Sequence, residues 1–275
     1  MDTIDKQPLV SIITPVFNGA KYLDELIRSV LEQDYPHVEH IVIDDGSTDN
    51  GATVGILKRY PHLRWWSREN KGQYATQNEG LAAARGSIVG VICADDKYVA
   101  PSTLSSVVQY WNLHPECGCV YGRTLRMDSD GRPLSVDGNY RQKPFPVWLL
   151  RYRLFLSHCS LFVARQLVLD KNIWFDTSFR YFGDWDWIIR LSMAGRFGYL
   201  DQPLSVYREY PGQTTHQLGL KLHLETKRIL RKHKSSLVLA WLLVSQHRIL
   251  KGLWILRKYG LRDLRTTVVD WRRRR

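Results

Sequence analysis

The amino-acid sequence predicts an α/β fold: a mostly parallel sheet flanked by helices, followed by a basic C-terminal helical tail. Apolar runs rich in β-branched residues alternate with stretches of helical spacing, the pattern of parallel strands joined by helices. Polar residues close three of these runs, as they do where ligands bind at the carboxyl edge of such a sheet. Excess positive charge is confined to the chain from Gln217 onward.

The first half of the chain gives the clearest alternation. Residues 9–16 form a continuous apolar run with β-branched side chains, which predicts a buried strand. Residues 21–33 carry apolar side chains at helical spacing. The elements expected next are a strand at 40–43, a helix at 50–60, a strand at 63–67, a helix at 73–85 and a strand at 88–94.

The second half is less regular. Residues 121–146 are richer in turn residues, and Asp130-Gly131 is a hairpin signal. Two further strands are expected at 159–163 and 197–200, with a helix at 184–194 between them.

Charge divides the chain into two parts. The net charge is +12, yet residues 217–275 hold 16 lysines and arginines against three acidic residues and so carry +13. We therefore expect a nearly neutral main domain at 1–216 and a basic amphipathic helical tail at 217–275. Because the positive charge lies in one tail without a recognition motif, a nucleic-acid partner is not expected.

The composition of the tail leaves two alternatives. Its Trp and Leu residues beside lysines and arginines suit a helix that lies on an anionic membrane surface. The other interpretation is a helix pair that packs on the domain or on a second subunit. No run reaches the roughly 18 apolar residues of a membrane span, and the polar start does not resemble a signal peptide. We expect a cytoplasmic protein, peripheral on the inner face of the membrane if the tail binds lipid.

The chain has four cysteines, whose spacing matches no zinc pattern and no redox CxxC motif. They are interpreted as reduced core thiols. They are Cys93, Cys117, Cys119 and Cys159.

Polar pairs follow three of the predicted strands: Thr14-Pro15, Asp44-Asp45 and Asp95-Asp96. One such pair alone often makes only a turn or a helix cap. The carboxyl ends of parallel strands share one edge, so the three pairs together predict a ligand crevice. No Gly-rich phosphate loop follows the first strand. A divalent cation, Mn²⁺ or Mg²⁺, is therefore expected to bridge carboxylates and a diphosphate.

Five segments of the sequence, in this order and spacing, resemble the family 2 glycosyltransferases of the GT-A fold. The likeness extends over about residues 8–215 and implies inverting sugar transfer from a nucleotide diphosphate. Such a displacement needs one base near the acceptor hydroxyl and positive charge on the leaving diphosphate. The segments read VSIITPVFNGAKYL, HIVIDDGSTD, ENKGQYATQNEGLAAARG, VICADDKYVAP and FGDWDWIIRLSMAG.

The resemblance implies a role for each polar group along the donor site. Asp45 would hydrogen-bond the nucleobase, usually uracil, which favours a UDP-sugar donor. Asp96 would ligate the metal, and Asp95 would approach the ribose or the donor sugar. The residues expected to border or cover the nucleotide are Thr14, Pro15 and the segment from Lys71 to Asn78.

Asp184 would be the general base, although its place before an apolar helix also suits a helix N-cap. The flanking tryptophans would desolvate this carboxylate and raise its basicity. On the acceptor side we expect Trp185 to stack on a sugar ring, Asp186 to hold an acceptor hydroxyl and His158 to lie near the reacting groups. For Asp186 the alternative is a contribution to the helix dipole, and for His158 a structural hydrogen bond.

The sequence departs from the family pattern in two places. Gly183 stands where the family often has Glu, and Tyr210 stands where many relatives carry a histidine that reaches the metal or the diphosphate. Arg208 would contact the diphosphate; its alternative is a surface salt bridge with Glu209.

The function that these observations favour is transfer of a sugar from a UDP-sugar to a hydroxyl of a saccharide or lipid-linked saccharide, in surface polysaccharide or glycolipid assembly. Two alternatives remain: a catalytically inactive module that binds a sugar nucleotide, and a sugar nucleotidyltransferase.

Overall fold

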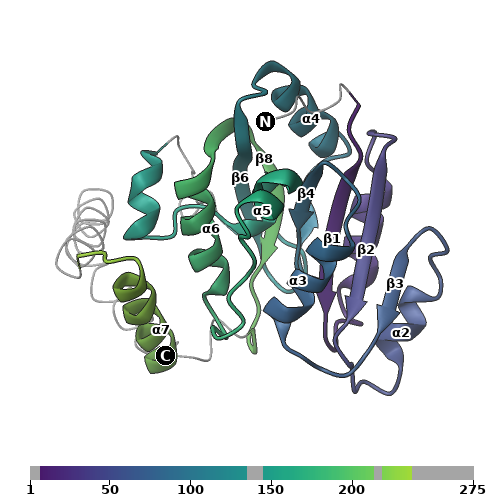
Figure 1. Cartoon of the computed structure of the whole chain (residues 1–275). Coiled ribbons are helices and arrows are strands. Elements are labelled where there is room, and N and C mark those ends of the chain that lie inside the picture. Colours follow the sequence, from purple (N-terminus) through teal and green to yellow (C-terminus); the bar gives the residue numbers. More distant parts are fainter. Residues whose placement is uncertain (1–6, 135–144, 214–218, 237–275) are drawn as a thin grey trace, which may run out of the picture. The chain divides into compact units, whose positions relative to one another are not determined.

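The computed structural model describes residues 7–134, 145–213 and 219–236, and its centre is an eight-stranded sheet (Figure 1). The strand order is β3-β2-β1-β4-β7-β6-β8-β5. The strands are β1 (Val10–Val16), β2 (Val38–Asp44), β3 (Arg64–Ser67), β4 (Ile88–Val91), β5 (Lys97–Tyr98), β6 (Cys117–Met127), β7 (Leu161–Ala164) and β8 (Arg196–Arg208).

The predicted α/β architecture is confirmed. Strands β3, β2, β1 and β4 run parallel, as their alternation with helices predicts. Strand β7 is antiparallel to both β4 and β6, so the sheet is mixed from that point. The helices are α1 (Leu23–Leu31), α2 (Ala52–Leu57), α3 (Gln73–Ala83), α4 (Thr103–Leu113), α5 (Arg165–Asp170), α6 (Gly183–Ala194) and α7 (Gly219–Lys232), with short 3₁₀ turns at η2 (Val147–Arg151) and η3 (His158–Ser160).

Apolar patterning explains the first layers of the fold. Every residue of β1 is buried, as expected for a central strand covered on both faces. Helix α1 buries one face through Leu23, Leu26, Ile27 and Val30, which recur every three or four residues. Helix α3 packs on β1 and β2, while α4 packs on β6 and β8.

The second half of the sheet differs from expectation. Strand β6 continues to Met127, into the start of the stretch expected to be rich in turns, and the Asp130-Gly131 turn follows it. Position 122 of this strand favours glycine, because a Cβ there would lie 2.5 Å from Leu204 in β8. Helix α4 was not among the predicted elements.

Contacts divide the chain into two compact units. The first comprises residues up to Leu150 and Leu154 to Thr226, and the second comprises Arg151–Arg153 and the chain from Lys227. The division falls inside α7, ten residues later than the shift in charge at residue 216. In the second unit, Arg151 Nη2 donates to the carbonyl oxygen of His233 at 2.7 Å.

Most of the predicted tail, residues 237–275, lies outside the described residues, so its membrane association stays a prediction. Within the part of the chain that the structure describes, no helix is both long and apolar enough to cross a bilayer.

Candidate active site

A cavity of about 1100 Å³ opens in the first unit at the carboxyl ends of β1, β2 and β4 and the start of α6. The polar strand ends therefore converge as predicted for a parallel sheet. Five carboxylate or imidazole groups among its lining residues organise the site: Asp45, Asp95, Asp96, His158 and Asp184.

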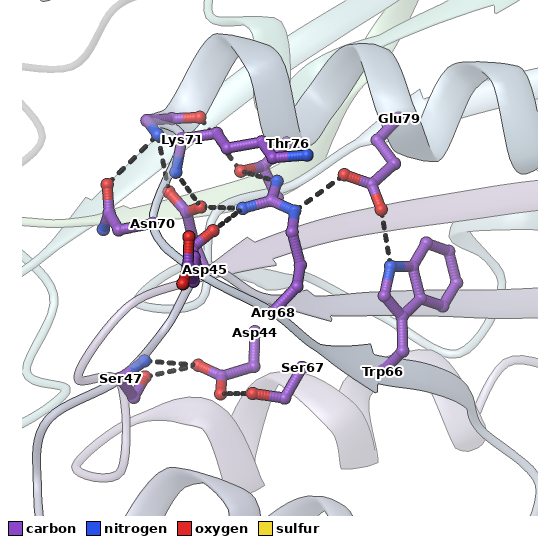
Figure 2. A network of polar contacts seen from close by, with 12 residues as sticks. Asp44, Asp45, Ser47, Trp66, Ser67, Arg68, Asn70, Lys71, Thr76 and Glu79 are labelled. Atoms are coloured by element: carbon purple, nitrogen blue, oxygen red, sulfur yellow. Dashed lines mark hydrogen bonds and ion pairs between the residues drawn. The ribbon is translucent and has the colours of Figure 1, made fainter.

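Asp45, directly after β2, is held by donors on three sides (Figure 2). Its two oxygens accept the backbone N–H groups of Lys71 at 2.8 Å and Gly72 at 3.0 Å, and it pairs with the Arg68 guanidinium. Arg68 is fixed in turn by Thr76 and Glu79, at 2.9 and 2.8 Å. The carboxylate is thus fixed in orientation while it still lines the cavity.

The neighbouring Asp44 has a different task. Its oxygens accept from Ser47 N at 3.1 Å, Ser47 Oγ at 2.5 Å and Ser67 Oγ at 2.5 Å (Figure 2). These bonds tie the β2 turn to the end of β3. Only the second aspartate of this pair reaches the cavity.

Asp95 and Asp96, after β4, differ in accessibility. The Asp96 carboxylate is 2% exposed and accepts from Arg208 N at 2.9 Å and Cys159 Sγ at 2.9 Å. Asp95 is less buried and accepts from the Tyr210 hydroxyl at 3.1 Å. Burial is the largest cause that raises the pKa of each carboxyl, well above the ordinary value for Asp96. The rise reflects the cost of burying a charged carboxylate.

Asp184 and His158 form a pair at the other side of the site. His158 Nδ1 lies 3.2 Å from Asp184 Oδ2, and the second Asp184 oxygen accepts from Trp185 N at 2.8 Å. Helix α6 begins at Gly183 without a side-chain cap, so Asp184 is not the N-cap that the alternative interpretation required. Burial lowers the pKa of His158, but the neighbouring Cys159 and Asp184 outweigh it and raise that pKa well above its ordinary value.

The loop before α6 is anchored by a residue that sequence reasoning did not select. The Glu225 carboxylate of α7 accepts the backbone N–H groups of Arg180, Tyr181 and Phe182, at 2.7, 2.9 and 2.9 Å. These three residues line the cavity immediately before Asp184. The first turns of α7 therefore support the site, although the charge pattern assigned them to the tail.

We expect Glu225→Gln to lower the turnover number for sugar transfer by roughly 10–100-fold, because a small displacement of a catalytic group is costly. Donor affinity should change little, since Asp45 is on a different segment. Initial rates and UDP calorimetry would separate the two quantities. Thr226→Ala is the matched control, because Thr226 Oγ1 donates to Leu222 O of its own helix. Equal turnover in both variants would contradict the anchoring role.

Several predicted donor residues do not reach the cavity through their side chains. Thr14 is fully buried and its hydroxyl lies 3.0 Å from His40 Nε2. Asn78 uses both ends of its amide on the backbone of Phe175, at 2.8 and 2.9 Å. Lys71 contributes its backbone N–H to Asp45, whereas Pro15 does line the cavity as predicted.

Arg208 needs a correction. It is 2% exposed, and its guanidinium donates to Asp95 O at 2.9 Å and pairs with Glu25. It also lies 4.2 Å from the Tyr22 ring centroid. Its donors are thus engaged inside the protein rather than turned toward a diphosphate, and the expected surface partner Glu209 pairs with Arg126 instead.

Two expected acceptor contacts are also corrected. Trp185 is 5% exposed, and its indole N–H donates to Leu150 O at 2.6 Å. Asp186 is fully buried and paired with Arg190 at 2.8 Å. Both side chains belong to the buried face of α6. Of the three acceptor residues predicted, the structure brings only His158 to the cavity.

Both departures at the site have local explanations. A Cβ on Gly183 would lie 2.6 Å from the ring of Tyr74, which is buried and stacked on Phe175. Tyr74 therefore occupies the space that a side chain at position 183 would need. Tyr210 packs at 5.4 Å on Tyr22 and donates to Asp95. Neither role is visible in the sequence, because each depends on a partner far along the chain.

Comparisons with known proteins agree with this geometry. A family model described as Glycosyl transferase family 2 matches residues 11–168. The chain is 28% identical over 208 residues to a chondroitin synthase of Escherichia coli, which covers 73% of this chain but 29% of the synthase. The chain thus spans less than a third of that relative.

Solved structures share the fold. S. aureus TarS 1–349 in complex with UDP-GlcNAc superposes with a TM-score of 0.65 at 19% identity, over 93% of this chain and 77% of that one. The mannosyltransferase PcManGT from Pyrobaculum calidifontis, in complex with GDP-Man and Mn²⁺, gives 0.59 at 21% identity, over 94% and 86%. At these identities the likeness shows the architecture.

Proposed function

The chain belongs to glycosyl transferase family 2, and we propose that it transfers a sugar, with inversion, from a UDP-sugar to a hydroxyl of a growing surface polysaccharide. The observation that carries this proposal is the convergence of Asp45, Asp95 and Asp184 on one cavity. In this proposal Asp45 accepts from the nucleobase, Asp95 lies at the diphosphate end of the donor, and Asp184 is the base. Similarity to a chondroitin synthase supports a polysaccharide acceptor.

Uracil is the nucleobase that Asp45 suits best. A carboxylate accepts the imide N–H of uracil, whereas cytosine presents an unprotonated ring nitrogen there. The pairing with Arg68 and the two backbone donors hold this carboxylate in one orientation before the nucleotide arrives. The UDP-GlcNAc complex of TarS supports the same choice.

We expect Asp45→Asn to weaken UDP binding by about 10–100-fold, the usual value of a hydrogen bond to a charged group. The preference for UDP over CDP should shrink as well, because the amide can donate to cytosine. Calorimetry with UDP, CDP and GDP would measure both effects. Asp201→Asn, on an exposed aspartate outside the cavity, is the control. Tighter binding of CDP or GDP than of UDP by the unaltered protein would contradict the assignment.

The residues at the end of β4 suit a divalent cation. Carboxylate oxygens are ligands that Mn²⁺ and Mg²⁺ prefer, and oxygens of Asp95 and Asp96 lie within 4.8 Å of each other. Asp95, the less buried of the two, would be the residue that holds the ion. When bound, the ion would offset the charge that develops on the leaving diphosphate. The Mn²⁺ complex of PcManGT supports this proposal.

Asp184 would accept the proton of the attacking hydroxyl. His158 holds this carboxylate from the side at 3.2 Å, and Glu225 fixes the loop that precedes it. Asp184 therefore serves as a positioned base at the wall of the cavity. The acceptor would enter beside Arg180, Tyr181 and Phe182, which line the same wall.

A product assay tests the function. The full chain is incubated with Mn²⁺, a panel of UDP-sugars and short oligosaccharide acceptors. We expect free UDP in equal amount to a glycoside whose anomeric configuration is opposite to that of the donor, as observed by NMR. Release of pyrophosphate from UTP and a sugar phosphate would instead identify a nucleotidyltransferase. Binding of UDP-sugars without transfer or hydrolysis under any of these conditions would identify an inactive binding module.

A further inference from the structure

Two thiols and an imidazole meet beside the cavity. The proposed transfer uses the Nδ1 side of this imidazole, which faces Asp184, and neither the thiols nor Nε2. Cys93 Sγ lies 3.3 Å from His158 Nε2, and Cys159 Sγ lies 3.6 Å from the same nitrogen. All three ligand atoms lie within 4.8 Å of one another. Cys159 Sγ is oriented by a hydrogen bond to Asp96 Oδ2 at 2.9 Å.

These separations match the edges of a tetrahedral zinc site. Zinc bonds of about 2.3 Å to sulfur and about 2.0–2.1 Å to nitrogen imply sulfur–nitrogen edges of about 3.5 Å. The two observed sulfur–nitrogen distances lie on either side of that value. An ion could therefore occupy the space between these atoms with little movement of the chain.

The orientation of His158 is a second, independent observation. A histidine that binds a metal usually directs its other ring nitrogen to a carboxylate, which fixes the tautomer. Here Nε2 faces the two sulfurs, and Nδ1 faces Asp184 Oδ2 at 3.2 Å. The outer carboxylate is thus already in place behind the imidazole.

We propose that Cys93, Cys159 and His158 Nε2 bind one thiophilic divalent cation, with Zn²⁺ the best fit. Thiolate and imidazole ligands select zinc over Mg²⁺ and Mn²⁺, which prefer oxygen. The site is therefore distinct in chemistry from the Asp95 carboxylate, although Cys93 borders both. Cys93 is half-buried and lines the cavity, which gives an ion a route of entry.

Cobalt substitution tests the proposal on the full chain, kept reduced and free of donor and acceptor. Titration with Co²⁺ should produce the near-ultraviolet thiolate-to-cobalt charge-transfer band and the visible bands of tetrahedral Co²⁺, saturating at one ion per chain. Zn²⁺ should abolish these bands, and excess Mg²⁺ should leave them. The readout is spectroscopic, so a failure of this proposal can be distinguished from a failure of the proposed transferase activity.

Cysteine variants locate the ligands. Cys93→Ser and Cys159→Ala should each lose the charge-transfer band. Each should also lower Zn²⁺ affinity by more than roughly 10–100-fold, the loss that follows removal of a residue that only hydrogen-bonds a metal ligand. Cys117→Ala is the matched control, because this buried cysteine is in β6, outside the cluster. If Cys159→Ala does not fold, the result for Cys93→Ser alone tests whether the thiols bind the ion. No band in the unaltered protein, a band unchanged in Cys93→Ser, or a band lost in Cys117→Ala would each overturn the proposal.

Discussion

Replacement of Asp184 by asparagine is expected to lower sugar transfer by about two to four orders of magnitude, the usual loss when a general base is removed. The amide keeps the size of the carboxylate and can still accept from Trp185 N, but it cannot take the hydroxyl proton. UDP affinity should be unchanged, because Asp45 and its donors come from other segments. Single-turnover rates and calorimetry with UDP would measure both quantities.

The same helix supplies a matched control. Asp186 is fully buried and paired with Arg190, so Asp186→Asn should lower the melting temperature and leave the transfer rate of the folded protein nearly intact. Asp184 does not cap α6, so Asp184→Asn should melt near the temperature of the unaltered protein. Near-normal transfer by Asp184→Asn would rule out its role as base. A folded Asp186→Asn that cannot transfer would restore the acceptor role expected from the sequence.

Local sequence patterns predicted the first half of the fold because its two central strands are fully covered. All residues of β1 and β4 are buried, so these strands read as continuous apolar runs. Their registers bring the ends of β1, β2 and β4 to one edge, which is why the cavity could be located from three polar pairs. The reversal at β7 could not be predicted, since a short apolar run does not reveal strand direction.

Side-chain roles at the site were harder to predict because they depend on contacts between distant segments. Asp184, Trp185 and Asp186 are all candidates for the site from the sequence. In the structure α6 begins at Gly183 and buries Trp185 and Asp186, whereas Asp184 lines the cavity. Arg208 looked available for a phosphate until its partner Glu25 was known, 183 residues earlier in the chain.

The cysteine cluster shows the same limit. Cys93 follows β4 and Cys159 lies in η3, so their separation of 66 residues matches no spacing motif. The antiparallel pairing of β4 with β7 brings these two segments together, with Ile88–Gly90 beside Phe162–Ala164. Metal-site rules based on spacing cannot detect such a site, whereas distances between ligand atoms can.

Asp95→Asn is expected to lower metal-dependent transfer by about three orders of magnitude, because a Lewis acid on the leaving diphosphate contributes several kcal/mol. The amide can still accept from Tyr210, so the fold at this point should be kept. Chelation of the unaltered protein should have a similar effect on transfer. Titration of Mn²⁺ in the presence of UDP, followed by electron paramagnetic resonance, would measure metal affinity directly.

Asp96→Asn tests which of the two carboxylates after β4 binds the metal. The family likeness assigned the metal to Asp96, but this side chain is enclosed and accepts from Arg208 N and Cys159 Sγ. The NH₂ group of the asparagine amide would face either Arg208 N or Cys159 Sγ, both of which are donors. One of these buried groups would then lose its acceptor, at a cost of about 1–3 kcal/mol of folding free energy. We therefore expect a lower melting temperature with Mn²⁺ affinity largely kept, the reverse of Asp95→Asn. If Asp96→Asn melts normally but loses Mn²⁺ while Asp95→Asn binds it, the metal belongs to Asp96 as first predicted.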